Sequence, residues 1–225
     1  MIVDSIILAR GGSKGIKNKN LIKVGNKPLL YWSVKKSLNS KKIRNTWVSS
    51  DSKRIINYAR NIGSKVIVRP KKYSMDNSSS ESAWLHAIKY IEKKNKCDAI
   101  LAIQPSSPIR IDNFDRAINF FEKSKFDSLF SSSIIKDYCV WKKNKNKFIA
   151  KYNFKNRKRR QQIKNYFLEN GSFYIFKIEK FKKTKNRLFG KIGTFIQSKK
   201  ESFQLDDIED LFIIKSLINN IKIYE

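Results

Sequence analysis

The chain has 225 residues, of which 30% are charged and 40% apolar, and its formal net charge is +30. A chain of this length fits one domain, and 15 Phe, 9 Tyr and 4 Trp supply a packed core, which excludes overall disorder. No apolar run approaches the ~20 residues of a membrane span, and no basic region precedes a leader-like segment. We therefore expect a cytoplasmic protein that does not insert into a membrane. The two cysteines, Cys97 and Cys139, indicate neither a disulfide framework nor a metal knuckle.

The positive charge is spread along the whole chain rather than gathered in one tail. Lys outnumbers Arg by 38 to 11, and the chain also holds 31 Ile and 20 Asn. Because Lys, Ile and Asn share A/T-rich codons, the bias has a genomic explanation, and we expect no nucleic-acid partner. A basic nucleic-acid-binding module remains an alternative. A field this positive also attracts small anions, nucleotides among them.

Short β-branched runs alternate with amphipathic segments through the first two-thirds of the chain. Strands are predicted over residues 5–8, 46–49, 65–68 and 99–103, and helices over 28–38, 52–62, 81–91 and 112–122. This alternation predicts βαβ crossovers, and therefore an α/β fold of three layers, α/β/α, around a mostly parallel, Rossmann-like sheet.

The pattern changes after residue 133. Residues 137–170 are dense in Lys, Arg, Asn and aromatic residues and show weak periodicity. We expect this segment to be an excursion from one domain spanning residues 1–225, because it is too short to form a domain itself. Strands are predicted again over 172–176 and 194–197, and a final helix over 207–217.

Ligands of open α/β sheets bind outside the carboxyl ends of the strands, which directs attention to the loops 9–20, 50–51, 69–80 and 104–110. The first loop combines three glycines with Arg10, Ser13, Lys14 and Lys19. Glycines let the backbone approach a ligand closely, and the cations favour an anion, so this loop is suited to a polyphosphate. Its glycine spacing fits neither a Walker loop nor a dinucleotide fingerprint. The lone His86 is interpreted as a packed or surface residue.

The loop from Ala9 to Ile16, followed by a Lys-Asn pair, resembles the opening of the acylneuraminate cytidylyltransferase family. Five further segments follow in the order of that family: Ser50-Asp51, Arg69-Pro70 with Asp76, Gln104 to Arg110, Arg159-Arg160-Gln161 leading to Asn170 and Tyr174, and the acidic cluster Asp206 to Asp210. The resemblance covers nearly the whole chain. It implies the nucleotide-diphospho-sugar transferase type of the α/β fold.

Two positions depart from the family pattern. An Asp-Ile-Asp triplet is common near the C-terminus, where its carboxylates are implicated in metal binding, but this chain has Gln204-Leu205-Asp206. Lys17 stands where proline is common. The resemblance leaves Asp206 as the expected protein ligand of Mg²⁺. Residues 204 and 206 are two apart on a predicted extended segment, so we expect their side chains to share a face. Asp206 or Asp207 is also suited to cap the last helix.

The resemblance implies that the anomeric hydroxyl of a 2-keto sugar acid attacks the α-phosphate of CTP, giving a CMP-sugar and pyrophosphate. The expected catalytic residues are Arg10, Lys19 and Asp206, with Asp206 also the Mg²⁺ ligand. The expected nucleotide-binding residues are Ala9, Arg10, Gly11, Gly12, Ser13, Lys14, Asn20, Arg69 and Ser78. The expected substrate-binding residues are Gln104, Arg160, Asn170 and Tyr174.

The resemblance also implies a nonulosonic acid similar to N-acetylneuraminate as the acceptor, for surface glycan synthesis, and a homodimer in which the excursion reaches a partner subunit. The residues of the excursion agree with this, because Trp141, Phe148, Tyr152 and Phe154 are too apolar for a solvated loop. Two alternatives stay open besides nucleic-acid binding. One is a sugar nucleotidyltransferase with a different nucleotide or keto acid, and the other is a homologue that binds nucleotide without turnover.

Overall fold

The computed structural model describes residues 1–13, 15–112, 114–136 and 139–220. Its centre is a seven-stranded sheet with the strand order β11-β7-β10-β6-β1-β4-β5. The strands of this sheet are β1 Val3–Leu8, β4 Ile43–Ser50, β5 Lys65–Val68, β6 Ala99–Ile103, β7 Ser128–Ile134, β10 Phe167–Lys177 and β11 Ile192–Ile196. Only β10 runs antiparallel to its neighbours in this sheet, so the predicted mostly parallel sheet is confirmed.

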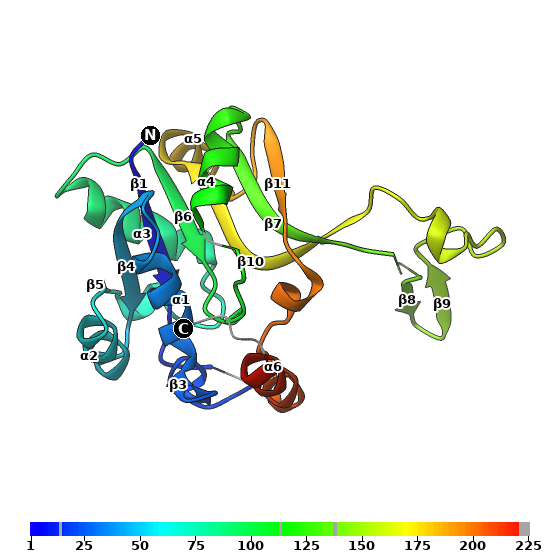
Figure 1. Ribbon diagram of the computed structural model, residues 1–225, viewed down its shortest axis with the longest axis horizontal. Helices are drawn as coiled ribbons and strands as arrows, with labels where there is room; N and C mark the ends of the chain where they lie inside the picture. Colours follow the sequence, from blue (N-terminus) through cyan, green and yellow to red (C-terminus); the bar gives the residue numbers. More distant parts are fainter. Residues whose placement is uncertain (14, 113, 137–138, 221–225) are drawn as a thin grey trace.

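Helices cover both faces of the sheet, as Figure 1 shows. The α-helices are α1 Leu29–Leu38, α2 Lys53–Asn61, α3 Ser80–Glu92, α4 Phe114–Lys123, α5 Ile178–Thr184 and α6 Ile208–Asn220. One hydrophobic core joins the sheet to α1, α2 and α4, and a second joins its other face to α3 and α5. The three predicted layers are therefore confirmed.

A third apolar cluster fixes α6 beside the first loop of the chain. It packs Leu211 and Ile214 of α6 against Leu29 and Trp32 of α1 and against Val24 of a small hairpin, β2 Lys23–Val24 and β3 Lys27–Pro28. The last helix and the N-terminal loop, far apart in the sequence, are thereby held together.

Strand β7 was not predicted, because its second half holds three consecutive serines, at positions 131–133. These serines are buried, and Ser131 Oγ donates to Asn170 Oδ1 at 2.6 Å and accepts from the Phe173 backbone N–H at 2.9 Å. Ser131 thus bonds to β10, and Ser132 Oγ lies 2.6 Å from Thr194 Oγ1 on β11. These bonds to the two neighbouring strands compensate the loss of apolar packing. Helix α5 was also missed, and β10 is longer than the predicted strand 172–176.

The excursion forms a separate hairpin of β8 Trp141–Asn144 and β9 Lys147–Ala150, which is not part of the main sheet. Figure 1 shows it projecting along the long axis, away from the sheet. The Trp141 ring lies 5.8 Å from Tyr152 and 5.6 Å from Phe154, while Phe148 is 66% exposed. The hairpin therefore has a small aromatic cluster of its own and an apolar surface facing solvent. No helix in the described part of the chain is long and apolar enough to cross a membrane.

Candidate active site

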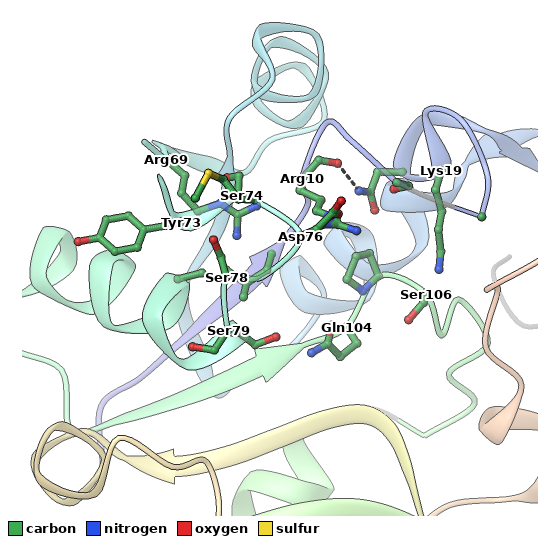
Figure 2. Close-up of a pocket in the computed structure, with 18 of the residues that line it drawn as sticks. Arg10, Lys19, Arg69, Tyr73, Ser74, Asp76, Ser78, Ser79, Gln104 and Ser106 are labelled. Atoms are coloured by element: carbon green, nitrogen blue, oxygen red, sulfur yellow. Dashed lines mark hydrogen bonds and ion pairs between the residues drawn. The ribbon is translucent and has the colours of Figure 1, made fainter. Parts of the chain in front are cut away.

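A cavity of about 440 Å³ opens where β1, β5 and β6 reach their carboxyl ends. It is closed by the turn η1 Lys19–Leu21 and by the segment between β5 and α3, whose side chains Figure 2 shows in close-up. Asp206 also lines it. Eight of the predicted site residues line it: Arg10, Ser13, Lys19, Asn20, Arg69, Ser78, Gln104 and Asp206. The neighbouring parallel strands bring these loops together because their carboxyl ends share one edge of the sheet.

The first loop is held by polar contacts at three points. Asn20, which is buried, donates from Nδ2 to the carbonyl of Arg10 at 2.9 Å. The Gly11 backbone N–H donates to Asp51 Oδ1 at 2.9 Å, and Arg10 Nη1 lies 2.9 Å from Asp76 Oδ1. The Gly11 amide is thus bonded to Asp51 in this structure, and its contact with the nucleotide stays a prediction.

Packing requires two of the loop's glycines. A Cβ on Gly11 would lie 2.9 Å from Ser52 Cβ, and one on Gly15 would collide with the carbonyl oxygen of Asp206. A Cβ on Gly12, in contrast, would meet open space. Gly15 was not among the predicted site residues, yet it lets the Asp206 segment approach the loop.

Lys19 Nζ donates to Asp206 Oδ1 at 2.7 Å, with the Lys19 side chain 17% exposed and that of Asp206 69% exposed. Asp207 caps α6, because its Oδ1 accepts from the Asp210 N–H at 3.0 Å. Asp210 Oδ2 accepts in turn from the backbone N–H groups of Asp206 and Asp207. The Asp206 carboxylate is thus turned to the pocket and Asp207 serves the helix.

Arg69 is 4% exposed although it lines the pocket. Burial lowers the pKa of its guanidinium, nearby Asp51 raises it, and Arg10 lowers it again. Its Nε finds no hydrogen-bond partner among the described residues. Burying a cation with an unpartnered donor costs free energy. An anion bound in the cavity would lower that cost by pairing with the Arg69 guanidinium.

Gln104 begins the loop that follows β6. Its backbone N–H donates to the Ser172 carbonyl at 3.0 Å, which joins this loop to β10. Farther on, Arg110 is fully buried and donates from Nη2 to the carbonyls of Gln104 and Ser172 at 2.7 and 3.2 Å. The pocket wall formed by Gln104, Pro105 and Ser106 is therefore supported from beneath by a buried cation.

Three predicted substrate-binding residues do not line this pocket, and two of them lie on β10. Asn170 is buried, and its amide bonds to Ser131, Gln197 and Ser202. Tyr174 is 4% exposed and donates from its hydroxyl to Glu169 at 2.5 Å. Burial is the main cause that raises the pKa of Tyr174 to about 12.

The third, Arg160, lies in the excursion, in the turn η3 Arg160–Gln162. It lines a different cavity of about 490 Å³, with Ile135, Leu168 and Phe203. Of the remaining predicted residues, Ala9 is buried and its N–H donates to the Ser49 carbonyl, whereas Lys14 lies outside the described residues.

Gln204 and Asp206 contact different partners. Gln204 Nε2 donates to the Asn170 carbonyl at 2.5 Å and lies against Gly171, while Asp206 contacts Lys19. Leu205 between them is fully buried, and the expectation that the two flanking side chains share a face stays a prediction.

Several residues that line the pocket had no predicted site role: Tyr73, Ser74, Asp76, Ser79, Ser80, Ala83 and Ser106. Most of them belong to the segment between Arg69 and the start of α3. The serine run at 78–80 was a usable signal, because Ser79 caps α3 by accepting from the Ser82 N–H at 3.2 Å. A helix N-terminus thus opens at the pocket, where its dipole favours an anion.

The pocket combines three cations, a helix N-terminus and several hydroxyl groups with two carboxylates that hold Arg10 and Lys19. Such a site can bind a polyphosphate and stabilise negative charge on a transferring phosphoryl group. Together with the open α/β sheet, these features are typical of a nucleotidyltransferase.

Comparison with known proteins agrees with this class. A family model described as Cytidylyltransferase matches residues 5–223, and the chain belongs to that family. The chain is 33% identical over 184 residues to N-acylneuraminate cytidylyltransferase A of Danio rerio, covering 79% of this chain and 42% of that protein. It is 31% identical over 177 residues to pseudaminic acid cytidylyltransferase of Campylobacter jejuni, covering 76% of each.

The fold has a solved counterpart as well. A CMP:2-keto-3-deoxy-manno-octonic acid synthetase, solved with CTP, superposes with a TM-score of 0.71 at 14% identity, covering 97% of this chain and 99% of the other. At that identity the likeness shows the fold. The chain spans about two fifths of the length of the two fish relatives that it matches. The resemblance to the acylneuraminate cytidylyltransferases and the fold type that it implied are confirmed.

Proposed function

We propose that this protein transfers CMP from CTP to the anomeric hydroxyl of a nonulosonic acid and releases pyrophosphate, as a step toward a surface glycan. Family membership supports the nucleotide, and the relatives named for acylneuraminate and pseudaminic acid support the acceptor class. The observation that carries the proposal is the meeting of Arg10, Lys19 and Arg69 around one pocket at the carboxyl edge of the sheet.

In this reaction the acceptor hydroxyl oxygen forms a bond to the α-phosphorus of CTP. The bond from that phosphorus to the bridging oxygen breaks, pyrophosphate leaves with the electron pair, and the hydroxyl proton passes to solvent. Phosphoryl transfer needs positioning and charge neutralisation more than covalent help from the protein. Arg10 and Lys19 suit that task, because both cations line the pocket and each is paired with a single carboxylate.

We propose Mg²⁺ as the cofactor, held by Asp206 together with phosphate oxygens of CTP. Among the described residues no three His, Cys, Asp or Glu side chains gather as a metal cluster, which fits a metal that arrives with the nucleotide. When bound, Mg²⁺ supplies positive charge to the triphosphate. The exposed Asp206 carboxylate, 2.7 Å from Lys19, is the protein group suited to hold it.

We also propose that the chain acts as a homodimer through the excursion. Exposed apolar side chains at Phe148, Ile149 and Phe154 support this, because an apolar patch of this kind favours a protein partner. Light scattering at micromolar concentration should give a two-chain mass, and a one-chain mass would contradict the dimer. We propose that the protein acts in the cytoplasm, because the proposed reaction uses CTP. This proposal depends on the proposed reaction and has no other support.

A pyrophosphate-release assay tests the reaction. CTP and Mg²⁺ are incubated with N-acetylneuraminate, pseudaminate or legionaminate, and UTP, GTP and ATP replace CTP in parallel samples. We expect release that requires both CTP and one of the acids. Equal release with another nucleotide would contradict the choice of CTP. Thermal stabilisation by CTP without release from any acid would instead identify a protein that binds nucleotide without turnover.

A further inference from the structure

Glu201 is a buried carboxylate outside the pocket, in the turn η4 Lys199–Ser202 between β11 and α6. It is 1% exposed, although it follows two exposed lysines in the sequence. Burying a carboxylate is costly unless hydrogen-bond donors surround it. The local turn alone does not explain why the Glu201 carboxylate is buried.

Five donors converge on the two oxygens of Glu201. Oε1 accepts from the backbone N–H groups of Ile111 and Asp112 at 2.9 and 3.4 Å and from Gln197 Nε2 at 3.1 Å. Oε2 accepts from the Ser198 backbone N–H at 3.0 Å and from its hydroxyl at 3.1 Å. The carboxylate thus ties the η4 turn to the loop that follows β6.

The two segments joined in this way each supply one wall of the pocket. The loop after β6 supplies Gln104 and Ser106, and the chain that leaves η4 supplies Asp206 five residues after Glu201. A direct bond also joins them, because the Leu205 N–H donates to the Ser106 carbonyl at 2.8 Å. Glu201 therefore sets the register of the Asp206 segment against the opposite wall.

The same network extends to β10. Gln197, which donates to Glu201, accepts at its Oε1 from Asn170 Nδ2 at 3.1 Å. The Asn170 carbonyl accepts in turn from Gln204 Nε2. The segment 197–204 is therefore hydrogen-bonded to Asn170 at both of its ends. Glu201 is the buried charged residue near its middle, and the segment leads through Leu205 to Asp206.

We infer that Glu201 is a positioning residue for the Asp206 side of the active site. This inference rests on the proposed function. Two of the residues expected to hold CTP are held by groups away from the Asp206 segment: Arg10 by Asp76, and the Arg69 N–H by the Ser50 carbonyl. The Lys19 side chain pairs with Asp206, but its backbone N–H is held by the Ile16 carbonyl at 3.2 Å. Loss of the Glu201 carboxylate should therefore leave CTP binding without metal intact and disturb the steps that need Asp206 in place.

Glu201→Gln is the first test, because it keeps the size of the side chain but turns an NH₂ group against backbone N–H donors. We expect the Mg²⁺ concentration at half-maximal rate to rise about tenfold and kcat to fall, which is the low end of the loss seen when groups that support a metal site from outside are removed. The Kd of CTP in EDTA, measured by calorimetry, should stay within about twofold of wild type. Ser198→Ala removes one of the five donors and should shift the Mg²⁺ requirement in the same direction by less.

Asp4→Asn is the matched control. Asp4 is also fully buried and hydrogen-bonded, by Arg44 and by Trp47 Nε1, but it lies at the opposite end of β1 from the pocket. Both variants should melt at a lower temperature than wild type. Only Glu201→Gln should change the Mg²⁺ requirement, when both are assayed well below their melting temperatures.

An unchanged Mg²⁺ requirement and kcat in Glu201→Gln would overturn the inference, and so would an equal change in Asp4→Asn. A Kd of CTP in EDTA weakened about tenfold would also overturn it, because the effect would then not be confined to the Asp206 side. If wild-type protein neither binds CTP nor releases pyrophosphate, the proposed function fails instead. The two failures are therefore distinguishable.

Discussion

On the nucleotide side of the pocket, Arg10, Lys19 and Arg69 come from the first 70 residues, and all three line one cavity within one chain. On the acceptor side, Gln104 is the single predicted substrate residue that lines this cavity. Asn170 and Tyr174 are engaged in buried contacts, and Arg160 lines another cavity, formed mainly by the end of β7 and the η4 region.

The nucleotide-binding residues therefore meet within one chain, whereas most of the predicted acceptor-binding residues do not reach the same cavity. Strand ends and a short turn suffice to bring the nucleotide residues together, because neighbouring parallel strands finish at one edge. The other three predicted acceptor residues belong to β10 and the excursion, and their contacts lie outside this cavity. We therefore expect CTP to bind a preformed surface, and the acceptor to depend on a second chain.

The largest expected effect tests the nucleotide side. Lys19→Ala and Arg10→Ala should each lower turnover at least about tenfold, since one charge-assisted contact to the transition state contributes ~2–4 kcal/mol. Lys17→Ala is the matched control, because Lys17 lies on the same loop but is exposed and does not line the pocket. Steady-state rates decide the question, and wild-type kinetics in both variants would remove the loop from the mechanism.

The next effect tests the acceptor side. Arg160→Ala should raise the KM of the acidic acceptor about tenfold and leave the KM of CTP unchanged, because a hydrogen bond to a charged group contributes ~1.5–3 kcal/mol. Lys143→Ala, on β8 of the same excursion, should change neither value. If Arg160→Ala raises the KM of CTP instead, the division into two sides is wrong.

A smaller effect is expected at the position where the family carboxylate is replaced. Gln204→Asp should not lower the Mg²⁺ requirement, because the residue contacts Asn170 rather than the Asp206 side. It should lower the melting temperature, since the shorter side chain loses the bond to the Asn170 carbonyl. A Mg²⁺ titration of the initial rate checks this, and a lower requirement would show that residue 204 reaches the metal. Asp206→Asn, measured beside it, should lose most turnover at limiting Mg²⁺.

The smallest effect concerns the carboxylate that holds Arg10. Asp76→Asn should tighten CTP binding about two- to fivefold, the range for losing one exposed ion pair that competes with the phosphates. Glu92→Gln, which removes a carboxylate paired with Lys182 at 2.8 Å, should leave binding unchanged. Calorimetry with CTP measures both, and weaker binding in Asp76→Asn would show that this carboxylate contacts the nucleotide.

The parts of the fold with regular periodicity were predictable from the sequence. The ranges 65–68 and 99–103 match β5 and β6, and α1 to α4 were placed within one or two residues of their ends. Strand β7 was not predicted because Ser131 and Ser132 are stabilised by bonds to β10 and β11, which no local pattern reveals. Short polar strands of this kind are recognised only once their partners are known.

The site also has a part that the sequence predicts and a part that it does not. Loop residues such as Arg10 and Arg69 follow strands directly, so their convergence could be predicted from strand order alone. The burial of Glu201 could not, because it follows Lys199 and Lys200 and one of its donors, Ile111, lies 90 residues away in the sequence. Contacts of that range depend on tertiary packing, which the sequence pattern does not display.

One mixing experiment tests whether each active site combines the nucleotide-binding residues of one chain with the acceptor-binding residues of another. Arg10→Ala and Arg160→Ala proteins are unfolded together, refolded at equal concentration and assayed for pyrophosphate release with CTP, Mg²⁺ and the acceptor. Half of the dimers should be mixed and should carry one intact site of two, so about a quarter of wild-type activity should return. Activity no greater than the mean of the two variants alone would contradict a shared site, because each chain would then supply both the nucleotide-binding and the acceptor-binding residues of its own site.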